Sequence, residues 1–228
     1  MRVFLGLPRL AERRACTLTI GNFDGVHRGH RALLQRVREA ARQHDVMPAA
    51  MTFEPHPREF FTPERAPTRI ANLRDKIEGF RRAGIERVFL HHFNRAFASL
   101  TADEFIERIL VDGCRVRWLV VGEDFRFGAR RAGNVELLRS YGQRCGFTVE
   151  QIAPVVLGEE RVSSSRIRAA LAAGDLALAG QLLGHPYAIS GRVMHGSKLG
   201  RQLGFPTRRS SPKFRVSDSQ GRGEPSNR

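Results

Sequence analysis

Residues 21–30 read Gly21-Asn22-Phe23-Asp24-Gly25-Val26-His27-Arg28-Gly29-His30. They follow a short apolar stretch, Cys16 to Ile20, and lead into residues 31–43, whose apolar side chains recur at helical spacing. This order predicts a strand, a glycine turn and a helix. Two imidazoles three residues apart in the first turn of a helix share one face, beside unpaired backbone N–H groups at the positive end of the helix dipole. Because such a position suits a phosphate, and because glycine lets a ligand approach the backbone, this segment predicts a nucleotide site.

The same strand-and-helix alternation continues along the chain. Further strands are predicted at 46–53, 86–91, 117–121 and 147–152, and further helices at 72–83, 101–111, 134–144, 163–173 and 175–183. Five strands that alternate with helices predict an α/β fold, a doubly wound parallel sheet with helices on both faces. Ligands bind such sheets at the carboxyl ends of the strands. We expect the glycine turn, a proline-rich loop after Phe53 and a phenylalanine-rich loop after Val121 to meet there.

Composition limits the class of protein. With 228 residues, 41% of them hydrophobic, the chain can bury the core of one good-sized domain. No run is apolar enough to span a bilayer, and Arg2, Pro8 and Arg9 interrupt any signal-like start, so we expect a cytoplasmic protein. Three scattered cysteines, without a C-x-x-C pair, indicate neither a disulfide framework nor a zinc cluster, and no metal site is expected.

The formal net charge of +15 would attract a polyanion. The arginines are spread along the chain, however, and aromatic residues are not interleaved with them in a stripe. Solvated arginines on helix faces are therefore the favoured interpretation. A basic nucleic-acid binding protein is kept as the less favoured alternative, and nucleic acid is not an expected partner.

Four ordered motifs carry a resemblance to a known family. The first is the H-x-G-H segment quoted above, and the others are Thr52-Phe53-Glu54-Pro55-His56-Pro57, Val121-Gly122-Glu123-Asp124-Phe125-Arg126-Phe127-Gly128 and Val162-Ser163-Ser164-Ser165-Arg166-Ile167-Arg168. Together they resemble bacterial FAD synthetase, the bifunctional riboflavin kinase/FMN adenylyltransferase, within the Rossmann-like H-x-G-H nucleotidyltransferases. The resemblance covers residues 1–186 as an adenylyltransferase domain.

The resemblance implies transfer of AMP from ATP, bound with Mg²⁺, to FMN, which gives FAD and pyrophosphate. It assigns catalysis to His27, His30 and Arg168, with Arg168 as a clamp on the β- and γ-phosphates. The implied ATP site consists of Gly21, Asn22, Phe23, Asp24, Gly25, Gly29, Ser163, Ser164, Ser165 and Arg166. Capping or core histidines, and plain N-capping by the serines, are the structural alternatives. Asp24 is expected to hold its own turn through an Asx-type bond rather than to act as a base.

The flavin would lie between two loops. The resemblance places it against Phe53, Pro55, His56, Pro57, Asp124, Phe125, Arg126 and Phe127. An isoalloxazine ring needs a flat apolar platform and a cation near its phosphate, which suits these residue types. Ordinary loop packing is the alternative. Another H-x-G-H nucleotidyltransferase, acting on a pantetheine or nicotinamide precursor, also remains open, as does the oligomeric state.

Residues 187–228 depart from the family pattern. His195 to Thr207 resembles the opening of the riboflavin kinase module, whose next residues should be alanine and asparagine, but Arg208 and Arg209 stand there. The following polar tail lacks apolar periodicity and is expected to be disordered. We expect a truncated remnant of the β-barrel kinase module, typical of a frameshift or truncation, without kinase activity.

Overall fold

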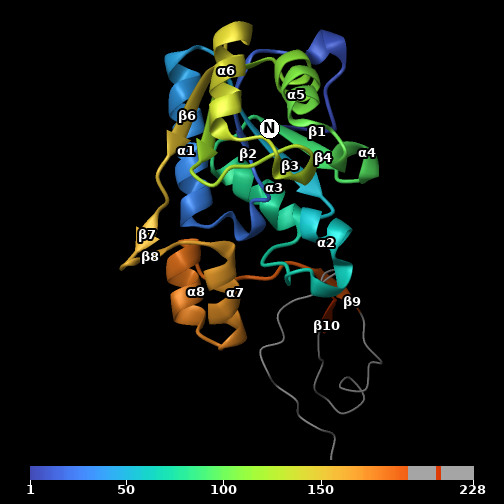
Figure 1. The fold of residues 1–228 in the computed structure, drawn as a ribbon. Helices are drawn as coiled ribbons and strands as arrows, with labels where there is room; N and C mark the ends of the chain where they lie inside the picture. Colours follow the sequence, from blue (N-terminus) through green and yellow to red (C-terminus); the bar gives the residue numbers. More distant parts are fainter. Residues whose placement is uncertain (195–208, 212–228) are drawn as a thin grey trace, which may run out of the picture.

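The computed structural model describes residues 1–194 and 209–211 (Figure 1). One sheet of six parallel strands has the order β1-β4-β3-β2-β5-β6. Its strands are β1 (Arg2–Leu5), β2 (Cys16–Ile20), β3 (Met47–Glu54), β4 (Arg87–His92), β5 (Val116–Gly122) and β6 (Thr148–Ile152). The predicted doubly wound parallel sheet is confirmed.

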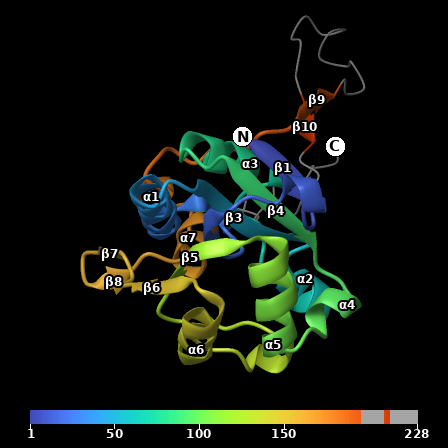
Figure 2. The same cartoon turned by 90° about the horizontal axis from the view of Figure 1, so that it is seen from above.

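Helices cover both faces of this sheet (Figure 2). One face carries α1 (Arg28–Gln43) and α3 (Leu73–Arg82), and the other carries η4 (Phe105–Gly113) and α6 (Val135–Cys145). The short elements between them are η1 (Leu10–Glu12), η2 (Asp24–Val26), α2 (Pro57–Phe61), η3 (Pro63–Arg65), α4 (Arg95–Ala98), α5 (Ala102–Glu104) and η5 (Ala129–Arg131).

Successive residues of the central strands point alternately into two hydrophobic cores, one on each face of the sheet. On β5, Leu119 and Val121 join the core under η4 and α6, whereas Val120 joins the core under α1 and α3. On β4, Phe89 joins the core under η4 and α6, and Val88 joins the core under α1 and α3. Because successive strand residues point to opposite faces, a continuous apolar run is what a strand covered on both sides requires.

A pair of helices packs beyond the carboxyl edge of the sheet, coloured orange in Figure 1. After β6 come the hairpin β7 (Val156–Leu157) and β8 (Glu160–Arg161), then α7 (Ser164–Ala172) and α8 (Leu176–Leu183). The two helices form a third, smaller core with Ile70 and Val162. This core fixes the start of α7 against the glycine turn.

The elements differ from the sequence expectations in several places, and the main ones are these. β1 was missed, because of its four residues only Phe4 is buried and the apolar signal of this edge strand is weak. α1 begins at Arg28 rather than residue 31, and α2 and η3 lie within the proline-rich loop. Residues 105–113 form a π-helix, which a nine-residue apolar pattern does not distinguish from an α-helix.

The C-terminal segment is described only in part. β9 (Arg192–Met194) pairs antiparallel with β10 (Arg209–Ser211), so the expected disorder is wrong for residues 210–211. The kinase-like motif at 195–207, Arg208 and the tail from 212 lie outside the described residues.

Candidate active site

The glycine turn after β2 is a tightly packed and unusual backbone. Phe23 and Val26 have left-handed φ values of 50° and 40°, and Gly25 has φ of 78°. A Cβ atom on Gly25 would lie 2.7 Å from Cγ2 of Ile70, so a side chain there would clash as well as strain the backbone. The turn is closed by the Phe23 ring, which is fully buried and meets the His30 ring edge-on at 5.1 Å.

The two histidines of the motif stack on each other. Their ring centroids are 3.6 Å apart with an interplanar angle of 18°. His27 is the N-cap of α1, and its Nδ1 accepts the His30 backbone N–H at 3.3 Å. Nδ1 of His30 is buried and has no hydrogen-bond partner among the described residues. His27 therefore caps the helix, as the structural alternative expected, whereas His30 has a buried ring nitrogen without a hydrogen-bond partner among the described residues.

Both imidazoles are neutral at pH 7. Burial lowers the pKa of His27 to about 4, against the opposing effect of the Asp24 carboxylate. Desolvation, with the charge of Lys76 and the neighbouring His27, lowers the pKa of His30 well below 6.5. Because Nδ1 of neutral His27 accepts a hydrogen bond, its proton resides on Nε2, which is then a donor available to a ligand.

Asp24 binds across the fold rather than within its own turn. Its carboxylate accepts the backbone N–H groups of Ile70 and Ala71 at 3.0 and 3.1 Å and pairs with Arg168 Nη2 at 2.5 Å. The expected local Asx-type bond is thus wrong, because a buried carboxylate is better satisfied by two amides and a guanidinium from a neighbouring loop and helix. Arg168 also donates from Nε to the Thr68 carbonyl at 2.6 Å, so two of its nitrogens are engaged within the protein.

The serines open α7 beside the glycine turn. Ser163 is the N-cap, with its Oγ accepting the Arg166 N–H at 3.2 Å, and Ser164 Oγ donates to the Asp24 carbonyl at 3.3 Å. Ser165 is exposed. Arg166 bonds the carbonyls of Leu157 and Glu160, so its guanidinium holds the β7–β8 hairpin.

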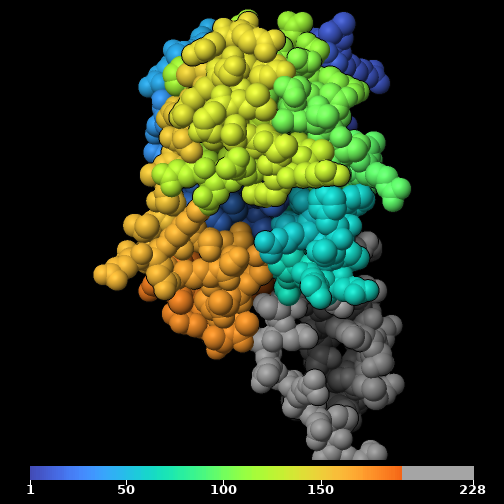
Figure 3. Space-filling model, viewed as in Figure 1, coloured from blue at the N-terminus to red at the C-terminus, as the bar shows by residue number. Residues whose placement is uncertain are grey.

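A cleft of about 270 Å³ joins these elements. It brings together five predicted residues, namely His27, Gly29, His30, Ser163 and Ser164. Residues from the ends of β5 and β6 and from the β7–β8 hairpin complete it, among them Gly122, Glu123, Pro154 and Arg161. Sequence reasoning missed them as nucleotide-site residues, although Gly122 is the last residue of β5 and Pro154 follows β6, at the edge where a shared site was expected. In Figure 3 a dark blue segment from the early part of the chain is recessed between orange, cyan and yellow-green segments.

The two loops predicted for flavin are joined by phenylalanines. The Phe53 ring lies 5.6 Å from that of Phe97, which lies 6.2 Å from that of Phe105, and Phe105 lies 5.4 Å from Phe127. Phe127 is only 7% exposed and belongs to the core, whereas Phe125 is partly exposed and stacks on it at 5.6 Å. Core packing therefore explains the presence of Phe127. Of the two rings, Phe125 is the one with surface that a ligand could contact.

Two polar members of the flavin set, His56 and Asp124, have partners within the protein. His56 is the N-cap of α2, in a capping box with Glu59, and Pro57 is the first helical residue after it. Pro55 follows Glu54 through a cis peptide bond. Burial lowers the pKa of His56 to about 4. Asp124 pairs with Arg161 of the cleft, and Arg126 is exposed.

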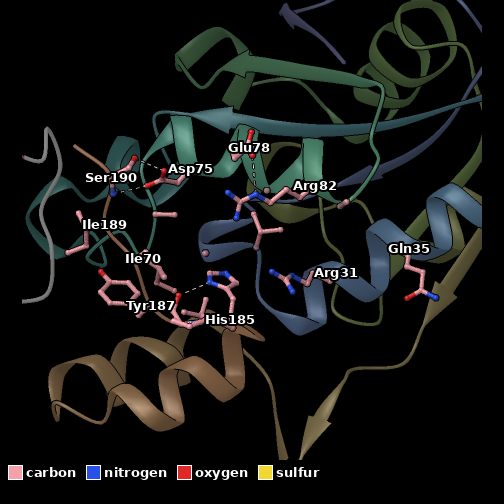
Figure 4. Close-up of a pocket in the computed structure, with 18 of the residues that line it drawn as sticks. Arg31, Gln35, Ile70, Asp75, Glu78, Arg82, His185, Tyr187, Ile189 and Ser190 are labelled. Carbon is pink, nitrogen blue, oxygen red and sulfur yellow. Dashed lines mark hydrogen bonds and ion pairs between the residues drawn. The ribbon is translucent and has the colours of Figure 1, made fainter. Parts of the chain in front are cut away.

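A second cavity, of about 880 Å³, lies between α1, α3 and residues 183–190 (Figure 4). Gly25 is the only predicted site residue on its wall. Several of its polar groups pair with one another or with the backbone: Ser190 bonds Asp75 and Asn72, Arg82 pairs with Glu78, and Arg31 donates to the Gly184 carbonyl. The Tyr187 hydroxyl on its wall is buried without a hydrogen-bond partner among the described residues. We therefore place the site at the smaller cleft, where the predicted residues converge.

Comparisons with known proteins identify related sequences. The family model for FAD synthetase matches residues 10–166, and that for riboflavin kinase matches residues 183–221. The bifunctional riboflavin kinase/FMN adenylyltransferase of Escherichia coli K12 is 46% identical over 223 residues, which is 97% of this chain and 71% of the relative. That of Pseudomonas fluorescens is 51% identical over 208 residues, 91% of this chain and 67% of the relative.

A solved structure is also similar. The Streptococcus pneumoniae protein described as a macrolide-efflux protein aligns with a TM-score of 0.75 and 30% identity, over 86% of this chain and 65% of that chain. Among the described residues, no helix has the length and apolar character needed to cross a membrane. The four motifs, the parallel sheet with its cleft and the match over most of the sequence lead to one conclusion: this chain belongs to the FAD synthetase family.

Proposed function

We propose that this chain is an FMN adenylyltransferase that makes FAD and pyrophosphate from FMN and Mg²⁺-bound ATP. The observation that carries the proposal is the stacked His27–His30 pair at the N-terminus of α1, in a cleft at the carboxyl edge of the sheet. Membership of the FAD synthetase family gives the substrates.

The reaction is an in-line displacement at the α-phosphorus. An oxygen of the FMN phosphate forms the new P–O bond as the bond to the β-phosphate breaks, and the electron pair leaves with pyrophosphate. No covalent enzyme intermediate is needed, so positioning and charge stabilisation can supply the catalysis. In the proposed complex, the Nε2–H of His27 and the first N–H groups of α1 donate to phosphate oxygens.

His30 has a separate task. The residue lines the cleft, and its Nδ1 is buried without a hydrogen-bond partner among the described residues. In the proposed complex, charge accumulates beside it as pyrophosphate departs. A polyphosphate nearby would raise the pKa of an imidazole whose pKa burial has lowered, and a protonated His30 could then donate to a leaving oxygen. Arg168 acts differently in this proposal: it fixes Asp24, and through Asp24 the turn, rather than clamping phosphate with its whole guanidinium.

The flavin occupies the other side of the site. We propose that Phe125 and the loop from Phe53 to Pro57 form its walls, with Phe127 as support behind Phe125. A boundary near residue 186 between adenylyltransferase and kinase-like parts, and a cytoplasmic location, belong to the same proposal. We also propose that nucleic acid is not a ligand. A filter-binding series with steep salt dependence at useful affinity would contradict that last statement.

Product analysis tests the function directly. Purified protein is incubated with ATP, Mg²⁺ and FMN, and FAD is followed by chromatography. We expect FAD and pyrophosphate in equal amounts, whereas a folded protein that makes no FAD would refute the proposal. Pantetheine and nicotinamide phosphates tested in place of FMN would identify another nucleotidyltransferase. Riboflavin tested in the same way should remain unphosphorylated, because Arg208 and Arg209 replace the expected alanine and asparagine.

Gly122 tests whether the cleft holds the nucleotide. An added Cβ atom meets nothing within 4 Å there, so Gly122→Ala places a methyl group in open space on the wall of the cleft. We expect unchanged thermal stability and weaker ATP binding. Gly180→Ala in α8 is the control, because its methyl group makes only ordinary contacts away from the cleft. Equal ATP affinity in both variants would place the nucleotide elsewhere.

A further inference from the structure

The larger cavity is a groove between α1 and α3 that the proposed function does not use. It follows α1 from Arg31 to Arg42, which is about 16 Å of an α-helix. Residues 183–190 cross one end of the groove from α8 to α3, where the Ser190 hydroxyl bonds Asp75. The volume of about 880 Å³ lies within the range of small-ligand sites, roughly 300 to 1,000 Å³. The groove can therefore hold one small molecule.

The two ends of this groove differ in chemistry. Both helices connect neighbouring parallel strands, so they run in the same direction and their last turns lie at the same end. Arginines line that end. Apolar side chains line the opposite end, beside residues 183–190 (Figure 4), namely Ile70, Leu183, Pro186, Tyr187 and Ile189. The buried Tyr187 hydroxyl at this end has no hydrogen-bond partner among the described residues. The groove therefore suits an elongated ligand with an apolar group at one end and an anionic group at the other.

Positive charge is in excess on the wall of the groove. Four arginines and three carboxylates line it: Arg31, Arg38, Arg42, Arg82, Glu39, Asp75 and Glu78. Two of these carboxylates also bind arginines that do not line the groove. Glu39 pairs with Arg36, and Glu78 pairs with Arg81 as well as with Arg82. The carboxylates therefore neutralise only part of the charge on the wall, and the groove attracts an anion.

Arg38 presents its donors to the groove. It is half-buried, and no hydrogen bond or ion pair joins its side chain to another described residue. Its guanidinium reaches from α1 to the residue after the end of α3, because a Cβ atom on Gly84 would lie 2.7 Å from Nε and 3.0 Å from Cζ. Arg42 lies one turn further along α1 and is likewise without a partner in the part of the chain that the structure describes. Guanidinium N–H groups bind two oxygens of one phosphate, so this pair is suited to a phosphate.

We propose that the larger cavity is a second ligand site, which takes an organic phosphate with a ring against Tyr187 and Ile189 and its phosphate on Arg38 and Arg42. Charge-assisted bonds hold the phosphate, and the apolar end buries the ring. Because residues 183–190 cross one end, the ligand is a small molecule rather than a polyanion that runs through the groove. Flavin and adenine nucleotides share this chemistry. The inference does not rest on the proposed function, which belongs to the smaller cleft.

Counting bound nucleotides tests the inference. FMN and AMP, and their phosphate-free parents riboflavin and adenosine, are each titrated calorimetrically into the complete chain. We expect the unaltered protein to bind FMN or AMP at one site more than Arg38→Met/Arg42→Met does, and the nucleotide that does so identifies the ring. The parent compound should show no such difference. Equal numbers of sites in both proteins for both nucleotides would overturn the inference, as would an extra site that the parent fills equally well.

Two further variants separate this site from general charge attraction. Arg139→Met/Arg144→Met removes the same charge from exposed positions on α6, on the other face of the sheet, and should keep the extra site. Ile189→Asp places a carboxylate at the apolar end, where Ile189 is 45% exposed, and should lose the site with an unchanged urea midpoint. Loss of the site in the α6 variant, or its retention in Ile189→Asp, would refute the proposal.

FAD formation provides the link to the smaller cleft. All these variants should make FAD at the rate of the unaltered protein, because none of the altered residues lines that cleft. A protein that makes no FAD but has the extra site refutes the adenylyltransferase and retains the second site. If Arg38→Met/Arg42→Met lowers the urea midpoint, Arg42→Met alone, at an exposed position, repeats the titration. An unchanged nucleotide affinity at the extra site in Arg42→Met would then contradict the proposed phosphate contact.

Discussion

The two cavities of this protein differ in what their polar groups do. The larger one, beside α3, is lined mainly by paired polar groups, such as Arg82 with Glu78 and Ser190 with Asp75, together with the unpartnered hydroxyl of Tyr187. The smaller cleft presents neutral imidazoles, an unpartnered His30 nitrogen and the first turns of α1 and α7. Each cavity thus has one unpartnered buried polar atom on a lining residue, so the convergence of the motif residues on the smaller cleft, rather than cavity volume, indicates the substrate site.

Histidine variants in the two cavities should show the largest contrast. We expect His30→Ala to lower kcat for FAD formation by about two to three orders of magnitude, because it removes one positioned donor, and to leave folding nearly unchanged. His185→Ala, in the larger cavity, should leave kcat within about twofold, as most surface changes do. Steady-state kinetics of both variants test the comparison. If His30→Ala is active, or His185→Ala is inactive, we have chosen the wrong cavity.

An Arg168 variant tests whether this side chain stabilises the fold or only binds phosphate. It pairs with a carboxylate that is 5% exposed, so Arg168→Ala should lower the free energy of unfolding by about 3 kcal/mol in the absence of ATP. Urea denaturation of Arg168→Ala, Asp24→Asn and the double variant measures the coupling. A phosphate clamp without a structural part would lower activity and leave stability in the absence of ATP unchanged.

Lowering the pH should reduce the stability of the protein through its buried histidines. The pKa values of His27, His56 and His91 are about 4 in the folded state, against an ordinary value of 6.5 in the unfolded chain, because burial disfavours the charged ring. Their contribution to stability is complete above pH 6.5. It is lost as pH falls towards 4, since only the unfolded chain binds protons there, with a slope of up to about 1.4 kcal/mol per pH unit for each histidine.

Urea midpoints between pH 7 and pH 4.5 measure this effect. His91→Phe should reduce the slope without changing kcat, because His91 packs against Phe97 and lines neither cavity. A slope that is the same in His91→Phe, or a stability that rises towards pH 5, would contradict these pKa directions.

A Ser190 variant tests whether the larger cavity is independent of catalysis, and it should have the smallest effect on stability. Its side chain and backbone bond Asp75 and Asn72 on α3. Ser190→Ala should cost about 1 kcal/mol of stability, as the loss of a typical hydrogen bond does, with kcat unchanged. Thermal denaturation and initial rates provide the measurement. A tenfold change in rate would show that residues 187–190 are coupled to the cleft, and the two regions would not be independent.

Local patterns account for what could be predicted. Asn72, Thr101 with Glu104, Asn134 and Ser163 were expected to cap helices, and each does so through its own side chain. Caps and apolar periods involve residues within one or two turns, so the sequence contains them directly. The same reasoning placed His27 and His30 on one face. It did not predict β1, whose pairing with β4 joins residues 85 positions apart.

The sequence by itself determined the alternation of strands and helices, and therefore the edge at which the motifs gather. Tertiary structure alone decided which groups meet there: that Asp24 binds Arg168 rather than its own turn, that Phe127 is core while Phe125 is not, and that Lys76 is buried. The physical reason is the sequence separation over which each kind of interaction acts. Backbone periodicity and caps act over a few residues, whereas burial and charge pairing depend on segments that only the folded sheet brings together.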